Sequence, residues 1–465
     1  MSRPLLRRRP DSSFPPTFTT TFTSHIDHFT LDIMQQHKHT NRRNKQRRTS
    51  TTLFHKYAAG KDLQRQRSKK RQLQQRRQQP QDSPKKSATF RFLCAAIQRA
   101  RRERWAVIAA ETQRIVLGDG KYVEERRIPV VSSSFTQCHQ QGPLADSLVP
   151  HVQPGPSVVR IPHDIFAQIQ LSSQGTTFYP HYSEMLAMWA STPRRTVVAD
   201  PPGTIIEFAR SSTLTAAHRL PSPSAEGATN PSTSVGVLSH ASPKKPGGSY
   251  LHGGDEQEDT LARHSSLVAS LSSPAAQAFY QEHKKHWVED GSGLHDHSMV
   301  YSPSVIVFRA DADDNCDTPP EDAVGGAFIT PYAINVISAV PVNAAAVRAK
   351  HLILPSEQEF FESGIRSAMK ERMARVLRAF EERGDRTLVL GAFGCGSSEN
   401  RAETIGAIWA ELLVCGERDG EQDARFKNVF EKVVFAVPGK FYQPFKRGYE
   451  MRVLEAEVTV AALSD

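Results

Sequence analysis

Three glycines that follow an apolar run have the spacing needed to bind a phosphate. Residues 387–390 read Thr-Leu-Val-Leu, an expected buried strand, and Gly391, Gly394 and Gly396 come next, ahead of an expected helix. Small residues expose backbone N–H groups, and a helix start attracts an anion. The loop is neither a Walker A motif nor a dinucleotide fingerprint, because no Gly-Lys-Ser/Thr follows and the G-x-G-x-x-G spacing is absent. Tight packing between strand and helix remains the alternative.

A second glycine pair precedes a cluster of acidic residues. Gly247 and Gly248 follow the apolar residues 235–238, and Glu258 and Asp259 lie at the start of an expected helix. Adjacent glycines after a strand let backbone N–H groups approach an anionic ligand closely. A connecting turn, and acids that complement the positive end of the helix dipole, explain the same residues without any ligand. Neither feature indicates a site by itself.

Other candidate residues favour structural interpretations. His283 and His286, like His295 and His297, have spacings that could ligate zinc, but they lie in a polar stretch. We expect solvated surface histidines there and no metal site. Cys395 has no indicated His partner that would make it a nucleophile, so we expect a small residue in a tight turn.

The elements that must position these loops alternate along the chain. From residue 235 onward, apolar strand-like runs alternate with helical stretches, which predicts an α/β sheet with helices on both faces. The expected strands are residues 235–238, 299–301, 305–308, 332–340, 387–391 and 432–437, and the expected helices are residues 99–116, 259–271, 357–383 and 400–413. We expect residues 118–196 to be irregular and residues 221–234 to form a loop. Trp287 and Trp409 are expected in the core.

Charge is concentrated near the N-terminus. The 465 residues have a net charge of +10, yet residues 1–90 carry 21 basic and 5 acidic side chains whereas residues 91–465 carry 38 and 44. Few aliphatic residues offset the entropy of ordering, so we expect residues 1–90 to be a disordered basic arm. Basic clusters within residues 41–79 suit nuclear import or nonspecific nucleic-acid contact, and a solvated arm without a partner is the alternative.

Composition also excludes several classes of protein. No apolar run of about 18 residues exists, so the chain is not an integral membrane protein. The five cysteines show neither CxxC spacing nor a dense disulfide framework, which favours a reducing compartment. No apolar segment follows the basic start, so we expect no secretory signal peptide. We expect nuclear or cytoplasmic placement, ahead of a mitochondrial presequence that the Arg-rich start also fits.

The two glycine segments together resemble a known family. The chain resembles the microbial-type poly(ADP-ribose) glycohydrolase catalytic domain, a macrodomain-like family with the signature Gly-Gly-Gly, about six to eight residues, and Gln-Glu-Glu. In its place stand Gly247-Gly248-Ser249, seven residues, and Gln257-Glu258-Asp259. Residues 390–396, Leu-Gly-Ala-Phe-Gly-Cys-Gly, match the family's Leu-Gly-Ala-Trp-Gly-Cys-Gly loop. We expect this domain at residues 91–450 and a C-terminal tail at residues 451–465.

The resemblance implies a three-layer α/β/α fold with a mixed central sheet that binds ADP-ribose. The family hydrolyses the ribose–ribose O-glycosidic bond of poly(ADP-ribose) and needs no metal or other cofactor. Its last Gln-Glu-Glu acid protonates the leaving oxygen and then activates water, while the neighbouring acid holds a ribose hydroxyl, which implies Asp259 and Glu258 as catalytic residues. The implied substrate-binding residues are Gly247, Gly248, Ser249, Gln257, Gly391, Phe393, Gly394, Cys395 and Gly396.

Three departures from the family pattern keep a second function open. Asp259 is one methylene shorter than Glu, which withdraws the carboxyl by roughly 1.5 Å, and a misplacement of about 1 Å can cost on the order of 10²-fold in rate. Ser249 adds a Cβ that restricts backbone freedom and ligand approach. Ser398 stands where many members have an aromatic. The alternative to a glycohydrolase is a catalytically silent reader that binds ADP-ribosylated proteins and uses its basic arm for nucleic acid or targeting.

Overall fold

The computed structural model describes most of the chain after residue 87. The described residues are 88–128, 157–196, 203–220, 234–289, 292–311, 325–350, 353–416 and 423–464. Residues 87–465 form one compact unit. Almost all of the expected basic arm, including residues 41–79, lies outside the described residues, so its disorder and its contacts remain predictions. Within the described residues, no helix combines the length and the apolar character needed to cross a membrane.

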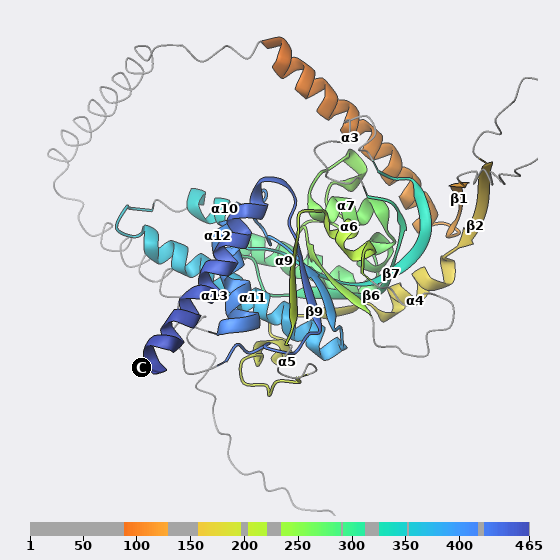
Figure 1. Ribbon diagram of the computed structural model, residues 1–465. Coiled ribbons are helices and arrows are strands. Elements are labelled where there is room, and N and C mark those ends of the chain that lie inside the picture. Colours follow the sequence, from red (N-terminus) through yellow and green to blue (C-terminus); the bar gives the residue numbers. More distant parts are fainter. Residues whose placement is uncertain are drawn as a thin grey trace, which may run out of the picture. The chain divides into compact units, whose positions relative to one another are not determined.

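A mixed β-sheet forms the centre of the described structure (Figure 1). Among the described residues its seven strands have the order β3-β6-β7-β5-β8-β9-β4. They are β3 (Thr177–Tyr179), β4 (Ile205–Ala209), β5 (Val235–His240), β6 (Met299–Arg309), β7 (Phe328–Ala339), β8 (Thr387–Leu390) and β9 (Lys432–Ala436). The strands from β7 to β4 pair in parallel, whereas β6 and β3 pair antiparallel. The predicted mixed sheet is confirmed.

Helices pack against both faces of this sheet, because successive strand residues point to opposite sides. On one face, Leu238 belongs to a core with residues of α10 (Ala344–Lys350), α11 (Gln358–Arg383), α12 (Ala402–Ala410) and α13 (Tyr442–Ser464). On the other face, Val237 belongs to a core with residues of α6 (Thr213–His218), α7 (Gln257–His264), α8 (Leu267–Leu271) and α9 (Pro274–Glu289). The three-layer α/β/α architecture is therefore confirmed.

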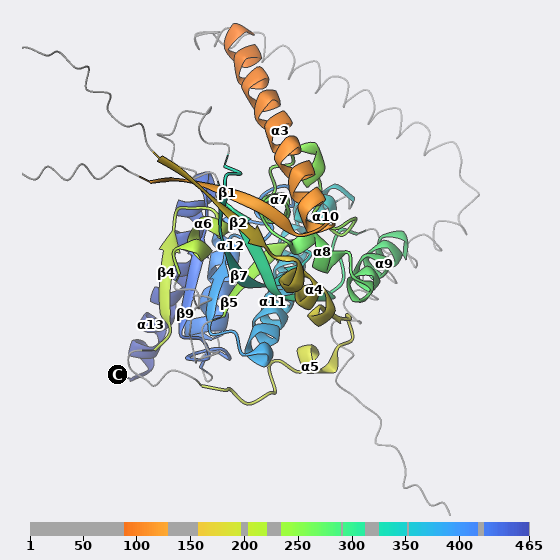
Figure 2. The same cartoon turned by 90° about the vertical axis from the view of Figure 1, so that its right-hand side faces the viewer.

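Residues 118–196 hold more regular structure than the sequence indicated. β1 (Lys121–Ile128) and β2 (Ser157–Asp164) pair antiparallel, and α4 (Phe166–Gly175) and α5 (Glu184–Ala187) follow. The strand β1 is mostly charged, so apolar alternation could not reveal it. The preceding helix α3 (Ala88–Val116) begins well before the predicted residue 99, and its N-terminal part extends away from the sheet (Figure 2).

The predicted helix at residues 259–271 is two helices. Ser265, between α7 and α8, has an extended backbone and forms an isolated β-bridge with Val307 of β6. The N–H of Ser266 donates to the carbonyl of Ile306 at 2.8 Å. Pairing with a strand distant in the sequence therefore interrupts a stretch whose local pattern favours one helix.

Other boundaries differ for similar reasons. β6 joins the predicted strands at residues 299–301 and 305–308 through a bulge, where Ser304 has a φ of +49°. The helix α12 continues into a short π-helix (Glu411–Cys415) at the end of the predicted 400–413 helix. The last helix, α13, runs without interruption across the predicted boundary between residues 450 and 451. Residues 451–464 are thus the second half of this helix, and most of its side chains after Val453 are exposed.

Candidate functional site

The N-terminus of α7 places both predicted acids at one edge of the sheet. Glu256 is the N-cap residue and accepts the backbone N–H of Asp259, whose Oδ2 accepts the N–H of Glu256 at 3.1 Å. This reciprocal pair is a capping box. Asp259 Oδ1 accepts the N–H of Ser249 at 2.5 Å. Both carboxylate oxygens of Asp259 therefore bind backbone, and they hold the glycine loop against the helix.

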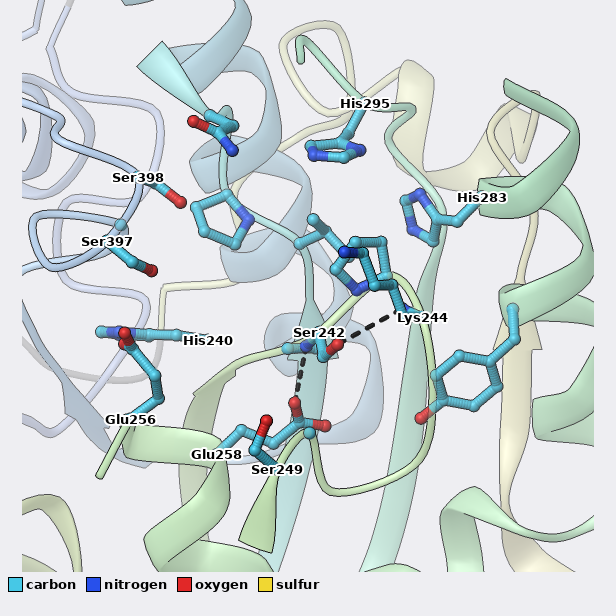
Figure 3. A pocket seen from close by; sticks show the side chains of 18 of the residues that line it. His240, Ser242, Lys244, Ser249, Glu256, Glu258, His283, His295, Ser397 and Ser398 are labelled. Carbon is cyan, nitrogen blue, oxygen red and sulfur yellow. Dashed lines mark hydrogen bonds between the residues drawn. The ribbon is translucent and has the colours of Figure 1, made fainter. Parts of the chain in front are cut away.

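Glu258 is bound at only one of its oxygens. The side chain is buried, and Oε2 accepts the N–H of Ser242 at 2.6 Å, a bond drawn in Figure 3. Oε1 is buried without a hydrogen-bond partner among the described residues. Burial raises the pKa of Glu258 to about 8; the charge of Asp259 adds to this shift, and backbone bonds from Ser242 and Gly247 oppose it. The carboxyl is therefore mostly protonated at neutral pH.

Burial also raises the pKa of Asp259, against the opposing effect of its two backbone N–H bonds and of Arg263. The two neighbouring acids thus differ in their bonding. Asp259 has no oxygen without a backbone donor, whereas Glu258, which also lines the cavity, keeps one oxygen without a hydrogen-bond partner among the described residues. The difference follows from which backbone segments lie beside each side chain.

The glycine pair brings the chain close to both acids. Gly247 and Gly248 have φ values of +68° and +58°, which favour glycine. A Cβ added to Gly248 would lie 2.7 Å from Asp259 Oδ1 and 3.3 Å from Glu258 Oε2. Ser249 has a φ of −104°, which any residue adopts, so the backbone restriction expected from the third-glycine replacement does not arise. The turn needs its first two glycines only.

Helix α3 supports this arrangement from behind. Thr112 donates to the carbonyl of Arg263, at the end of α7, at 2.7 Å. The ring of Trp105 lies 4.3 Å from the guanidinium of Arg101 and 4.5 Å from that of Arg263. The backbone of Gly253 packs so closely on the carbonyl of Arg102 that no side chain fits there. The loop between the glycine pair and the acids is therefore packed against α3.

The loop after β8 forms a second wall. Gly394 has a φ of +72°, and a Cβ there would lie 2.6 Å from both Pro341 Cβ and Asn400 Nδ2. Gly394, Gly396 and Ser398 line the cavity, but Gly391, Phe393 and Cys395 do not. Phe393 and Cys395 are buried behind the lining.

Cys395 is buried in the turn after β8 and does not line the cavity. Its side chain is 3% exposed, and burial raises the pKa of its thiol to about 12. The thiol is therefore protonated at neutral pH and is a poor nucleophile.

A cavity of about 790 Å³ opens between the two glycine loops (Figure 3). Six predicted site residues line it: Gly248, Ser249, Glu258, Asp259, Gly394 and Gly396. Gly247 and Gln257 lie behind the lining. Gln257 accepts the N–H of His240 at 2.8 Å and donates to the carbonyl of Leu238 at 2.8 Å, so it ties α7 to the end of β5. Its substrate-binding role stays a prediction.

Several lining residues were missed by the sequence analysis. His240 at the end of β5 lines the cavity together with Ser242 and Lys244 of the segment that follows. Helix α9 contributes Tyr280, Gln281, His283, Lys284 and Trp287. Figure 3 shows His283 and His295 on the side of the cavity away from Ser397 and Ser398. The lining residues of α9 share one face at helical spacing, which is the signal that could have revealed them.

The prediction of solvated surface histidines is wrong for His283 and His297. Both are buried, and the ring of His297 stacks on that of His181 at 5.3 Å. His283 Nε2 lies 3.5 Å from Asp296 Oδ1, and burial lowers the pKa of His283. The antiparallel strand β6 starts two residues after His297, and packing around the start of that strand buries the histidine. Among the described residues no group of three or more His, Cys, Asp or Glu side chains is arranged to hold a metal.

The prediction that Trp287 and Trp409 lie in the core is confirmed for only one of them. Trp409 is fully buried and donates its indole N–H to the carbonyl of Gly391 at 3.1 Å, as expected of a core residue. Trp287 is 55% exposed at the cavity, so its predicted place in the core is wrong. Sequence composition marks an indole as a core candidate but does not tell how much of its helix is covered by neighbouring elements.

Comparison with known proteins confirms the resemblance. Residues 158–310 match the family model described as the microbial-type PARG, catalytic domain. The crystal structure of poly(ADP-ribose) glycohydrolase from Thermomonospora curvata is similar with a TM-score of 0.53 and 27% identity, over 74% of this chain and 99% of that chain. The structure of that protein bound to the inhibitor ADP-HPD gives a TM-score of 0.51 and 27% identity, over 75% and 99%. No curated protein sequence matches the chain.

Proposed function

We propose that this protein, a relative of the microbial-type poly(ADP-ribose) glycohydrolases in sequence and in fold, is itself a poly(ADP-ribose) glycohydrolase. It binds an ADP-ribose unit in the cavity between the two glycine loops and hydrolyses the ribose–ribose O-glycosidic bond. The observation that carries the proposal is the buried carboxyl of Glu258, a residue of the cavity lining whose Oε1 has no hydrogen-bond partner among the described residues. Burial raises the pKa of this carboxyl to about 8, which favours its protonated form at neutral pH. The complex of the Thermomonospora curvata protein with the inhibitor ADP-HPD supports an ADP-ribose-like ligand.

Glu258 is suited to act as the general acid. Its proton passes to the leaving ribose oxygen as the bond to the anomeric carbon breaks, which relieves the charge on that oxygen. The N–H groups of Ser242 and Gly247 then stabilise the carboxylate that forms. Water adds to the anomeric carbon and returns a proton to Glu258, so the acid is regenerated.

Asp259 is assigned a positioning role. The family pattern puts the acid at this place, but here both oxygens accept backbone N–H bonds from Ser249 and Glu256. The shorter side chain keeps the carboxylate near its own helix start. Asp259 thereby holds the turn that contains Gly248 beside Glu258.

The loop after β8 is assigned to the pyrophosphate. Gly394 and Gly396 present backbone without side chains to the cavity, and Ser397 and Ser398 add hydroxyls at the same wall. Lys244 lies on the cavity lining as well and supplies a cation for the phosphates. These groups bind the ligand independently of the acid.

A catalytically silent reader of ADP-ribosylated proteins is the second candidate. The bonding of Asp259 favours it, because the residue at the family's acid position has no free oxygen for a substrate. A reader needs the loop after β8 and the turn at Gly247 and Gly248 to bind its ligand, but it needs no catalytic acid. The two candidates share one binding site and differ in turnover.

Release of ADP-ribose from purified poly(ADP-ribose) separates these functions. We expect turnover by the wild type, loss of turnover in Glu258→Gln, and calorimetric binding of ADP-ribose by both proteins. Binding without wild-type turnover would identify a reader. Absence of both binding and turnover would overturn the assignment of the site.

A further inference from the structure

Helix α9 forms a wall that leads from the acid to the mouth of the cavity. Tyr280, His283, Lys284 and Trp287 line the cavity from one helix face, at spacings i, i+3, i+4 and i+7. Tyr280 and His283 are buried, whereas Trp287 is 55% exposed. Tyr280 lines the same cavity as Glu258, and burial, followed by the charge of Glu258, raises the pKa of its phenol. Seven residues of helix separate Tyr280 from Trp287, a rise of about 10 Å.

Trp287 is an indole held at the cavity mouth without a place in the core. Trp105 and Trp409 are only 7% and 0% exposed. A large aromatic ring gains free energy when it is covered, and an exposed ring beside a nucleotide-sized cavity provides a surface on which a base can stack. Lys284, one turn earlier, also lines the cavity, and its ammonium makes no ion pair with any described residue. An aromatic surface and a cation that makes no ion pair within the described part of the chain therefore lie one helical turn apart at the mouth.

The chemistry of the ribose–ribose bond defines which group lies beyond the acid, at the mouth of the cavity. In a ribose–ribose bond the leaving oxygen belongs to the ribose of the next ADP-ribose unit, which carries an adenine and a diphosphate. An amino-acid side chain as leaving group carries neither of them. The adenine is a flat ring that stacks on an indole, and the diphosphate is an anion that attracts an ammonium.

We propose that Lys284 and Trp287 form a subsite for the ADP-ribose unit on the leaving-group side of the bond. Trp287 stacks on the adenine of that unit and Lys284 pairs with its diphosphate. A ligand that extends past the scissile bond therefore binds more tightly than a single ADP-ribose unit, through these two side chains. This inference rests on the proposed glycohydrolase function, because it takes the acid and the scissile bond to lie at Glu258.

The first test is binding by protein that does not turn over. Two ligands, ADP-ribose and a dimer of ADP-ribose units, are titrated into the Glu258→Gln variant, by calorimetry and by tryptophan fluorescence. We expect tighter binding of the dimer and a fluorescence change with the dimer that Trp287→Phe removes while dimer binding persists. In the Glu258→Gln protein, the additional substitution Trp287→Ala is expected to weaken dimer binding by about 5- to 150-fold, the range for loss of one base–aromatic stack. The same substitution should leave the binding of ADP-ribose unchanged.

Matched controls isolate the two side chains. Lys285 is exposed and is absent from the cavity lining, so Lys285→Glu changes the charge of α9 equally without touching the subsite. Lys284→Glu should weaken dimer binding more than Lys285→Glu does, and the difference should shrink as salt is added. Phe166, 45% exposed on α4, is the control for removing a surface aromatic.

The outcomes separate this inference from the function on which it rests. Equal loss of ADP-ribose and dimer binding in Trp287→Ala, or no loss of either, overturns the leaving-side subsite while the proposed function stands. The leaving-side subsite is also overturned if Trp287→Ala, with Glu258 intact, loses turnover equally on the polymer and on a peptide that carries one ADP-ribose. If wild-type protein binds neither ligand, the proposed function fails and the subsite fails with it.

Discussion

Ser249 donates its backbone N–H to Asp259 Oδ1 at 2.5 Å, a bond that joins the glycine turn to the first turn of α7. The same carboxylate accepts the N–H of Glu256 through Oδ2. Its neighbour Glu258 lines the cavity, and its Oε1 has no hydrogen-bond partner among the described residues. Two adjacent acids of similar chemistry thus have separable roles, and the predictions below test them separately.

Replacing Glu258 with Gln should abolish most turnover. The amide has the same shape but cannot donate an acidic proton, so we expect a loss of about 10²- to 10⁴-fold in kcat. Release of ADP-ribose from the polymer measures it, and Glu282→Gln, which changes an acid of α9 outside the cavity lining, is the control. Retained turnover in Glu258→Gln would show that another group supplies the proton.

The pH dependence should report the same group. Glu258 must be protonated to act, and burial raises its pKa to about 8, so kcat should fall as the pH rises through about 8. The stability of the folded protein should change with pH in the same direction as kcat. The folded state keeps a proton that the unfolded chain loses near its ordinary pKa of 4.5, so the free energy of unfolding should decrease between about pH 4.5 and 8.

Chemical unfolding at several pH values measures that slope, and Glu258→Gln should reduce it. An activity profile that rises through pH 8 would contradict the assignment of Glu258 as the acid.

Asp259→Asn tests the positioning role. Asn keeps one acceptor oxygen, so one of the two backbone bonds is lost and we expect a decrease of about 1 kcal/mol in the free energy of unfolding. Because the turn beside the ligand loosens, KM should rise more than kcat falls. A collapse of kcat with an unchanged KM would instead make Asp259 the acid.

Gly248→Ala should reduce both stability and ADP-ribose affinity. The residue has a φ of +58°, and its new Cβ would lie 2.7 Å from Asp259 Oδ1. Gly384→Ala is a matched control, because Gly384 has a φ of +78° with no atom within 4 Å of the added Cβ. Both variants carry a backbone penalty of about 1–2 kcal/mol. Thermal unfolding should show a larger loss for Gly248→Ala, and equal losses would mean that the carboxylates tolerate the Cβ.

Cys395→Ala should keep turnover. The thiol is buried with a pKa raised to about 12, so it takes no part in the chemistry. We expect a stability loss of about 1 kcal/mol from the small cavity that remains. Polymer hydrolysis by this variant at less than a tenth of the wild-type rate would contradict a purely structural role.

Several elements could be predicted because their signals are local. The apolar runs of β5, β8 and β9 match the strands of the structure, since a strand buried on both faces needs a continuous apolar run. The two glycine segments indicated where backbone must approach a ligand, and they carried the family resemblance. The Ser265 interruption between α7 and α8 could not be predicted, because it depends on pairing with β6.

The sequence by itself determined that two glycine turns, a pair of acids and an α/β sheet occur in one chain, because each is encoded within a few neighbouring residues. Only the tertiary structure decided which acid keeps a free oxygen, since the donors Ser242 and Ser249 reach Glu258 and Asp259 through the packing of β5, α3 and α7. It also decided that His283 turns inward on α9 while Trp287 remains exposed. A helix pattern specifies which residues share a face, but the packing of the sheet and its neighbours specifies how far along the helix that face is covered.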